Sequence, residues 1–158
     1  MFLSDKKKMI LYFLIIIFFV IFDRFFKFLA INNFFNQPIR LIGDFFQMQF
    51  VKNYYIAFSL PFKGIFLNIL IILIIILLLY YLIAVFKRKE YGQTILLVLI
   101  ILGAISNLFD RIRLGYVVDY LDLKYFTVFN LADVMIVGGV IGLLILNFFN
   151  KKTPQRSV

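Results

Sequence analysis

The chain has 158 residues, of which 64% are hydrophobic and 16% charged; its net charge is +9, and it contains neither cysteine nor histidine. Soluble domains are about half apolar and about a quarter charged, so this composition predicts a single integral membrane domain, residues 1–158. The missing residue types exclude disulfides, Ser-His and Cys-His catalysis, and the usual nitrogen and sulfur ligands of zinc. The basic residues flank apolar segments in short runs, which argues against a nucleic-acid partner.

Four stretches are long and apolar enough to cross a membrane as helices, which takes roughly 20 residues. They predict an all-α membrane protein with four transmembrane helices, at residues 9–31, 64–86, 91–109 and 129–149. The first stretch is interrupted near its end by Asp23, Arg24 and Lys27. No small-x-small cleavage site follows its apolar run, so we expect an uncleaved span rather than a signal peptide.

Basic clusters predict the orientation of the chain. Four spans place both termini on one side, together with three basic clusters, at residues 6–8, at 87–89, and at 151–152 with Arg156. The positive-inside rule makes this side the cytoplasm. Residues 32–63 and 110–129 are then extracytoplasmic segments.

The first extracytoplasmic segment contains a strand pattern. Phe46, Met48 and Phe50 alternate with Gln47 and Gln49, which is typical of a strand with one apolar face. We therefore expect a small β-sheet on the outer membrane surface, between the first and second helices.

Polar residues are predicted to gather near the outer face of the membrane, because each lies at an outer helix end or in the loop beyond it. They are Asp23, Lys27, Ser106, Asn107, Asp110, Arg111, Asp119, Asn130 and Asp133. Asp23 and Lys27 are four residues apart and share a helical face. Gly103, Asn107 and Arg111, also four apart, form a stripe typical of a face turned to other helices or to a watery cavity. Their convergence in so apolar a chain predicts a functional site.

Each of these polar groups also has a purely structural explanation. Asn130, followed three residues later by Asp133, is close to a capping-box pattern at a helix start. Asp119 has no predicted helix start to cap, and a lone loop aspartate is ordinarily solvated. Two ion pairs that anchor helix ends account for the remaining carboxylates: Asp23 with Lys27, and Asp110 with Arg111.

Two long motifs resemble the signature of the bacterial lipoprotein signal peptidase (signal peptidase II) family. They are NLFDRIRLGYVVDYLDL at residues 107–123 and FNLADVMIVGG at residues 129–139. Two shorter motifs, DRFFK at residues 23–27 and NYYIAFSL at residues 53–60, also resemble the family. The four motifs come in the family's order, and the resemblance covers nearly the whole chain.

The resemblance implies a membrane-embedded aspartyl endopeptidase that removes signal peptides from diacylglyceryl-modified prolipoproteins, cutting just before the lipidated cysteine. It implies the bacterial cytoplasmic membrane, an active site near the outer face, prolipoprotein signal peptides and membrane lipids as partners, and no cofactor, metal or obligate protein partner. The family's catalytic pair corresponds to Asp119 and Asp133. Its other recurrent polar positions, with substrate-binding or supporting roles, correspond to Asn53, Asn107, Arg111, Asn130, Asp23, Lys27 and Asp110.

The chain departs from the family pattern at three places. Tyr55 stands where the family's Asn-x-Gly-Ala-Ala-Phe motif has glycine, a Gly-Gly pair reads Leu102-Gly103, and a Gly-Asn step reads Ser106-Asn107. A side chain in place of glycine adds bulk and limits close backbone approach. These departures predict an altered substrate groove with Tyr55 in contact with it, while both aspartates are retained.

Two carboxylates that share one proton suit peptide hydrolysis without metal, histidine or cysteine. Two other hypotheses remain open. One is a Ser-Lys hydrolase that uses Ser59 or Ser106 with Lys52 or Lys63. The other is a small, non-enzymatic transporter or assembly subunit with an acidic cation or proton site. Substitution of the aspartates separates the first two hypotheses, and a hydrolysis assay on a lipidated peptide separates both from the third.

Overall fold

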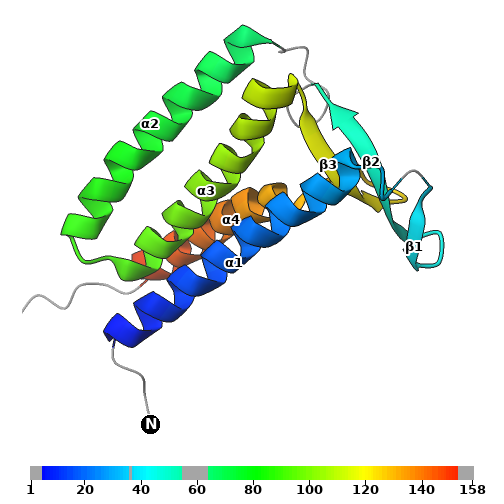
Figure 1. The fold of residues 1–158 in the computed structure, drawn as a ribbon. Helices are drawn as coiled ribbons and strands as arrows, with labels where there is room; N and C mark the ends of the chain where they lie inside the picture. The colour runs from blue at the N-terminus through cyan, green and yellow to red at the C-terminus, as the bar shows by residue number, and fades with distance from the viewer. Residues whose placement is uncertain (1–4, 36, 55–63, 153–158) are drawn as a thin grey trace, which may run out of the picture.

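The computed structural model describes residues 5–35, 37–54 and 64–152. It has helices α1 (Asp5–Ile31), α2 (Ile65–Lys87), α3 (Tyr91–Leu114) and α4 (Leu131–Lys152). A four-stranded antiparallel sheet follows the order β1 (Ile39–Ile42), β2 (Phe46–Asn53), β3 (Val117–Leu123) and β4 (Val128–Phe129). The sheet lies at one end of the helices, and the start of α1, the α2–α3 turn and the end of α4 lie toward the other (Figure 1).

Three of the described helices are long and apolar enough to cross a membrane, namely Ile65–Lys87, Tyr91–Leu114 and Leu131–Phe149. Apolar side chains such as Phe66 and Leu77 on α2 are exposed, so that lipid would cover them. The prediction of a mostly helical membrane protein with a small sheet is confirmed, but the sheet is not confined to the segment between the first and second helices, because β3 and β4 follow α3. Four transmembrane helices are not confirmed, because α1, which carries Asp23, Arg24 and Lys27, is not among the three helices that meet this criterion within the described residues.

The segment after residue 109 differs most from the prediction. α3 continues to Leu114, so the helix extends past the predicted boundary at residue 109 and includes Asp110; Arg111 lies in it as well, as its spacing from Gly103 and Asn107 predicts. The helix ends at Gly115, whose φ of 81° is the left-handed conformation that favours glycine. Strand β3 follows, although the sequence shows no alternation there, because its residues from Val117 to Tyr120 are buried on both faces.

A bulge in β2 sets the register that matters for the site. Met48 lies opposite Leu121, but Val51 lies opposite Asp119, so that β2 carries one extra residue between these pairs. A one-residue shift moves every following side chain to the other face of the strand. The bulge therefore places Asn53 on the same face as Asp119 and diagonal to it.

The other face of β3 packs against the end of α1. Val118 and Tyr120 are buried there with Ala30 and Met48, and the Tyr120 ring stacks on Phe26 with 5.5 Å between ring centres. Met48 lies on the predicted apolar face of β2, and Phe50 packs against the same cluster. This core fixes the sheet on the helices, so that one strand, β3, contributes to both the core and the polar site.

Gly103 allows α3 and α4 to approach closely, and Gly103→Ala is expected to destabilise the protein. A Cβ at this position would lie 2.6 Å from the carbonyl oxygen of Ala132, so the helices must separate. We expect a loss of about 1–3 kcal/mol in the free energy of unfolding. Gly138→Ala on α4 is the control, because its Cβ would meet no atom within 4 Å. Thermal unfolding in detergent measures both variants; equal midpoints would contradict the close approach.

Candidate active site

Asp119 lies in β3 with both carboxylate oxygens hydrogen-bonded. Asn53 donates to Oδ2 at 2.9 Å, and Asn130 donates to Oδ1 at 2.7 Å. Only 1% of the Asp119 surface is exposed. The aspartate expected in a loop therefore lies in a strand, between an amide from β2 and an amide from the start of α4.

Asp133 lies in the first turn of α4 and forms the predicted capping box. The backbone N–H of Asn130 donates to Asp133 Oδ2 at 3.2 Å, and the backbone N–H of Asp133 donates to Asn130 Oδ1 at 2.9 Å. The capping role does not use the whole carboxylate, because Asn107 also donates to its Oδ1 at 2.7 Å. Asp133 is thus joined to α3 as well as to its own helix end.

Two asparagines link the carboxylates of Asp119 and Asp133. The fully buried Asn130 donates its side-chain amide to Asp119 and its backbone N–H to Asp133. The same amide also reaches Asn107 Oδ1 at 3.1 Å and the carbonyl of Val118 at 3.3 Å. The structure therefore brings together the two aspartates that the motifs single out, although they are 14 residues apart in the sequence.

Lys27 joins this pair to a second group of charges. Its ammonium donates to Asn107 Oδ1 at 2.7 Å and lies 3.1 Å from Asp23 Oδ2 and 2.8 Å from Asp110 Oδ2. All three charged side chains are fully buried. Because Lys27 occupies the Asn107 oxygen, the Asn107 amide nitrogen is directed to Asp133. The predicted Asp23–Lys27 pair is confirmed.

Arg24 and Tyr120 belong to the same network, although neither is among the predicted site residues. Arg24 pairs with Asp110 at 2.6 Å, and the Tyr120 hydroxyl donates to Asp23 Oδ1 at 3.2 Å. The Tyr120 oxygen also accepts the backbone N–H of Leu131, so it joins α1 to the start of α4. The position of Arg24 between Asp23 and Lys27 could have indicated its role. Nothing in the sequence indicates the role of Tyr120, because the direction of its side chain depends on how β3 packs in the fold.

The environment of Asp119 favours its protonated form. Burial raises the pKa of Asp119 to about 7, and the negative charge of Asp133 acts in the same direction. The hydrogen bonds from Asn53 and Asn130 and the charge of Lys27 oppose this rise. A carboxyl group that titrates near neutral pH is suited to proton transfer.

Arg111 lies within electrostatic reach of Asp119 and Asp133. It also lines a hollow of about 200 Å³, here called the Asn68 hollow. The hollow lies between the end of β2, the start of α2 and the end of α3. Its lining residues are Tyr54, Gly64, Ile65, Leu67, Asn68, Arg111 and Gly115. A positive charge beside a hollow near two carboxylates suits a polar ligand. The predicted contact of Tyr55 with the groove lies outside the described residues and stays a prediction.

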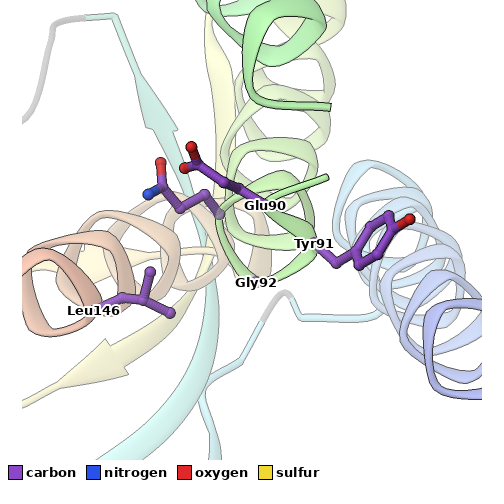
Figure 2. A pocket seen from close by; sticks show the side chains of 5 residues that line it. Glu90, Tyr91, Gly92 and Leu146 are labelled. Atoms are coloured by element: carbon purple, nitrogen blue, oxygen red, sulfur yellow. The ribbon is translucent and has the colours of Figure 1, made fainter. Parts of the chain in front are cut away.

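A second hollow, of about 260 Å³, lies at the opposite end of α3 (Figure 2). Glu90, Tyr91, Gly92 and Gln93 line it at the α2–α3 turn, and Leu146 of α4 completes it. One carboxylate at the rim offers no pair for shared-proton chemistry. Among the described residues, no group of three or more acidic side chains is placed to hold a metal ion.

The contacts of the candidate Ser-Lys residues do not support that hypothesis. Ser106 Oγ donates to Asp23 Oδ2 at 2.6 Å, whereas the Lys52 ammonium lies 5.2 Å from the centre of the Tyr116 ring. Ser59 and Lys63 lie outside the described residues. The hydroxyl of Ser106, where the family pattern has glycine, is used in the buried charge network.

Comparison with known proteins places the chain in one family. The family model described as signal peptidase (SPase) II matches residues 15–149. The chain is 41% identical to the lipoprotein signal peptidase of Caldanaerobacter subterraneus over 86% of this chain and 95% of that protein. It is 36% identical to the lipoprotein signal peptidase of Clostridioides difficile over 90% and 99%. A solved structure described as a bacterial membrane enzyme matches with a TM-score of 0.79 and 25% identity over 93% of both chains.

Proposed function

Because the chain belongs to the signal peptidase II family, we propose that it is an aspartyl endopeptidase that removes signal peptides from diacylglyceryl-modified prolipoproteins. Family membership supports a membrane-embedded peptidase that acts on prolipoproteins. The aspartic type rests on one observation: the buried residue Asn130 hydrogen-bonds both Asp119 and Asp133. No cofactor is part of the proposal.

The proposed chemistry uses one proton held by the pair of carboxylates. The ionised carboxylate takes a proton from the attacking water, whose oxygen bonds to the scissile carbonyl carbon. The protonated carboxyl donates its proton to the carbonyl oxygen, which gives a tetrahedral intermediate. When that intermediate collapses, the C–N bond breaks and the leaving amine receives a proton from the protonated member of the pair. A hydroxyl of the intermediate returns its proton to the ionised member as the new carboxyl group forms, so the pair again holds one proton. The proton is a property of the coupled pair rather than of either aspartate.

The other polar residues are proposed to support this pair. Asn53, Asn107 and Asn130 donate hydrogen bonds to the two carboxylates and so fix their orientation. Arg111, which lines the Asn68 hollow, is proposed to hold carbonyl oxygens of the substrate backbone. The remaining three residues, Asp23, Lys27 and Asp110, hold Asn107 in place through a buried charge network.

We further propose that α1 is a fourth span, that the whole chain is one domain in the bacterial cytoplasmic membrane, and that both termini are cytoplasmic. A chain without cysteine suits single-cysteine labelling. An impermeant thiol reagent applied to intact cells is expected to label Tyr125→Cys, which is 83% exposed in the β3–β4 turn. Ser4→Cys and Ser157→Cys are expected to stay unlabelled until the cells are opened. Labelling of both end positions in intact cells would contradict this orientation.

The test of the proposed function is a cleavage assay with purified protein. A diacylglyceryl-modified prolipoprotein and its unmodified form are incubated with the protein, and a shift on a gel reports removal of the signal peptide. We expect cleavage of the modified form in the presence of a chelator. A well-folded protein that leaves the modified form intact would refute the proposal. That result would favour the alternative of a non-enzymatic protein with an acidic cation or proton site.

A further inference from the structure

Helix α2 contains one side-chain amide, that of Asn68, which is not suited to contact with lipid. Between Ile65 and Phe86, every residue except Asn68 is apolar or tyrosine. A side-chain amide in a spanning helix is costly unless it faces a protein interior or a water-filled cavity. Asn68 meets this condition, because it is half-buried and lines the Asn68 hollow.

Among the described residues, no hydrogen bond to the Asn68 side-chain amide holds the fold together. Its backbone N–H bonds to the carbonyl of Gly64 at 3.3 Å, as expected one turn into a helix. Within residues 5–35, 37–54 and 64–152, no hydrogen bond involves its side chain. An amide of this kind, at the edge of a hollow, retains both its donor and its acceptor for a ligand.

The hollow adjoins residues that are linked to the aspartate pair. Tyr54 follows Asn53, which donates to Asp119, and Arg111 lines the hollow while lying within electrostatic reach of both aspartates. Asn68 lines the same hollow from a different helix, α2. A peptide whose scissile bond lies at the pair would therefore pass Asn68 with a neighbouring part of its backbone.

We propose that Asn68 is a substrate-positioning residue whose side-chain amide pairs with the backbone N–H and C=O of the bound signal peptide. This inference rests on the proposed function. A peptide group offers one donor and one acceptor, which matches an amide, whereas the esters of a diacylglyceryl group offer acceptors alone. A backbone contact contributes to binding whatever the side chains of the signal peptide are.

A binding measurement tests this role without turnover. The parent protein carries Asp119→Asn, which keeps substrate intact, and the ligand is the diacylglyceryl-modified prolipoprotein. Adding Asn68→Leu is expected to raise Kd about 5- to 100-fold, which is the loss of two neutral hydrogen bonds. Asn68→Gln retains an amide and is expected to recover part of the affinity. Ile69→Leu, at the neighbouring lipid-exposed position, is expected to leave Kd unchanged.

Active protein provides a second readout. Asn68→Leu is expected to raise KM by a similar factor with little change in kcat, because the contact forms equally in the ground and transition states. Unchanged Kd and KM would overturn the inference and leave the proposed function intact. Weaker binding of a lipidated cysteine peptide without the signal sequence, but not of the signal peptide itself, would also overturn it. Asn68→Ala serves as the second variant if the leucine variant does not fold.

Discussion

Asp119→Asn is expected to lower kcat for the diacylglyceryl-modified prolipoprotein by about 10,000-fold or more. Asparagine keeps the shape of the side chain but removes the group that exchanges a proton. In the wild type, the side-chain amides of Asn53 and Asn130 donate to the two carboxylate oxygens of Asp119. In the variant, the new NH2 group would face one of these donors, so a modest loss of stability is also expected. Gel-shift kinetics measure the rate, and thermal unfolding measures the fold.

Asp122→Asn is the matched control for this variant. Asp122 lies in the same strand, and Gln49 donates to its Oδ2 at 2.6 Å, so the substitution disturbs a similar amide–carboxylate contact. We expect this variant to stay largely active, because Asp122 has no hydrogen bond with Asn130 among the described residues. Equal inactivation of both variants would indicate a general need for negative charge in β3 and would contradict a specific pair.

The wild-type pH dependence follows from the same residue. The pKa of Asp119 is raised to about 7 by burial and by the charge of Asp133. The pair needs one proton, and that proton is lost as the pH rises through about 7. Cleavage is therefore expected to fall above this pH, and the fall belongs to the titration of the pair.

The sequence predicts the parts of this site that depend on local spacing. Asp23 and Lys27 share a helical face whatever surrounds them, and the capping box of Asn130 and Asp133 needs one turn of helix. The strand at residues 46–50 follows from alternation, because Met48 and Phe50 on its apolar face pack in or against the core. These features involve residues within four positions of each other, so periodicity suffices to predict them.

Features that depend on pairing between distant segments escaped prediction. Asn53 reaches Asp119 because of a bulge in β2, and no residue in the sequence marks that bulge. Arg24 reaches Asp110 across 86 residues, and Tyr120 reaches Asp23 across 97. The resemblance to a family supplied Asn53 and Asp119 as functional positions, but only the register of β2 against β3 gives the physical reason for their contact.

Asp133→Asn is the second substitution with a large expected effect. An asparagine oxygen still accepts the N–H of Asn130, so the capping box is kept. The side-chain NH2 of the new asparagine would face the NH2 of Asn107, whose orientation Lys27 fixes. Two donors that face each other are expected to lower the free energy of unfolding by about 1–2 kcal/mol. The proton-exchanging group is lost, so kcat is expected to fall by about 10,000-fold or more. The double variant with Asp119→Asn is expected to be little worse than either single variant, because the pair acts as one unit.

The central claim is that Asp133 takes part in catalysis in addition to capping α4. It is tested most directly by the turnover of purified Asp133→Asn, measured beside its thermal unfolding midpoint. A catalytic pair predicts a protein that unfolds within several degrees of wild type and has almost no cleavage of the diacylglyceryl-modified prolipoprotein. Near-normal turnover in a well-folded Asp133→Asn protein would show that the carboxylate serves only as a helix cap, and would contradict the aspartyl mechanism.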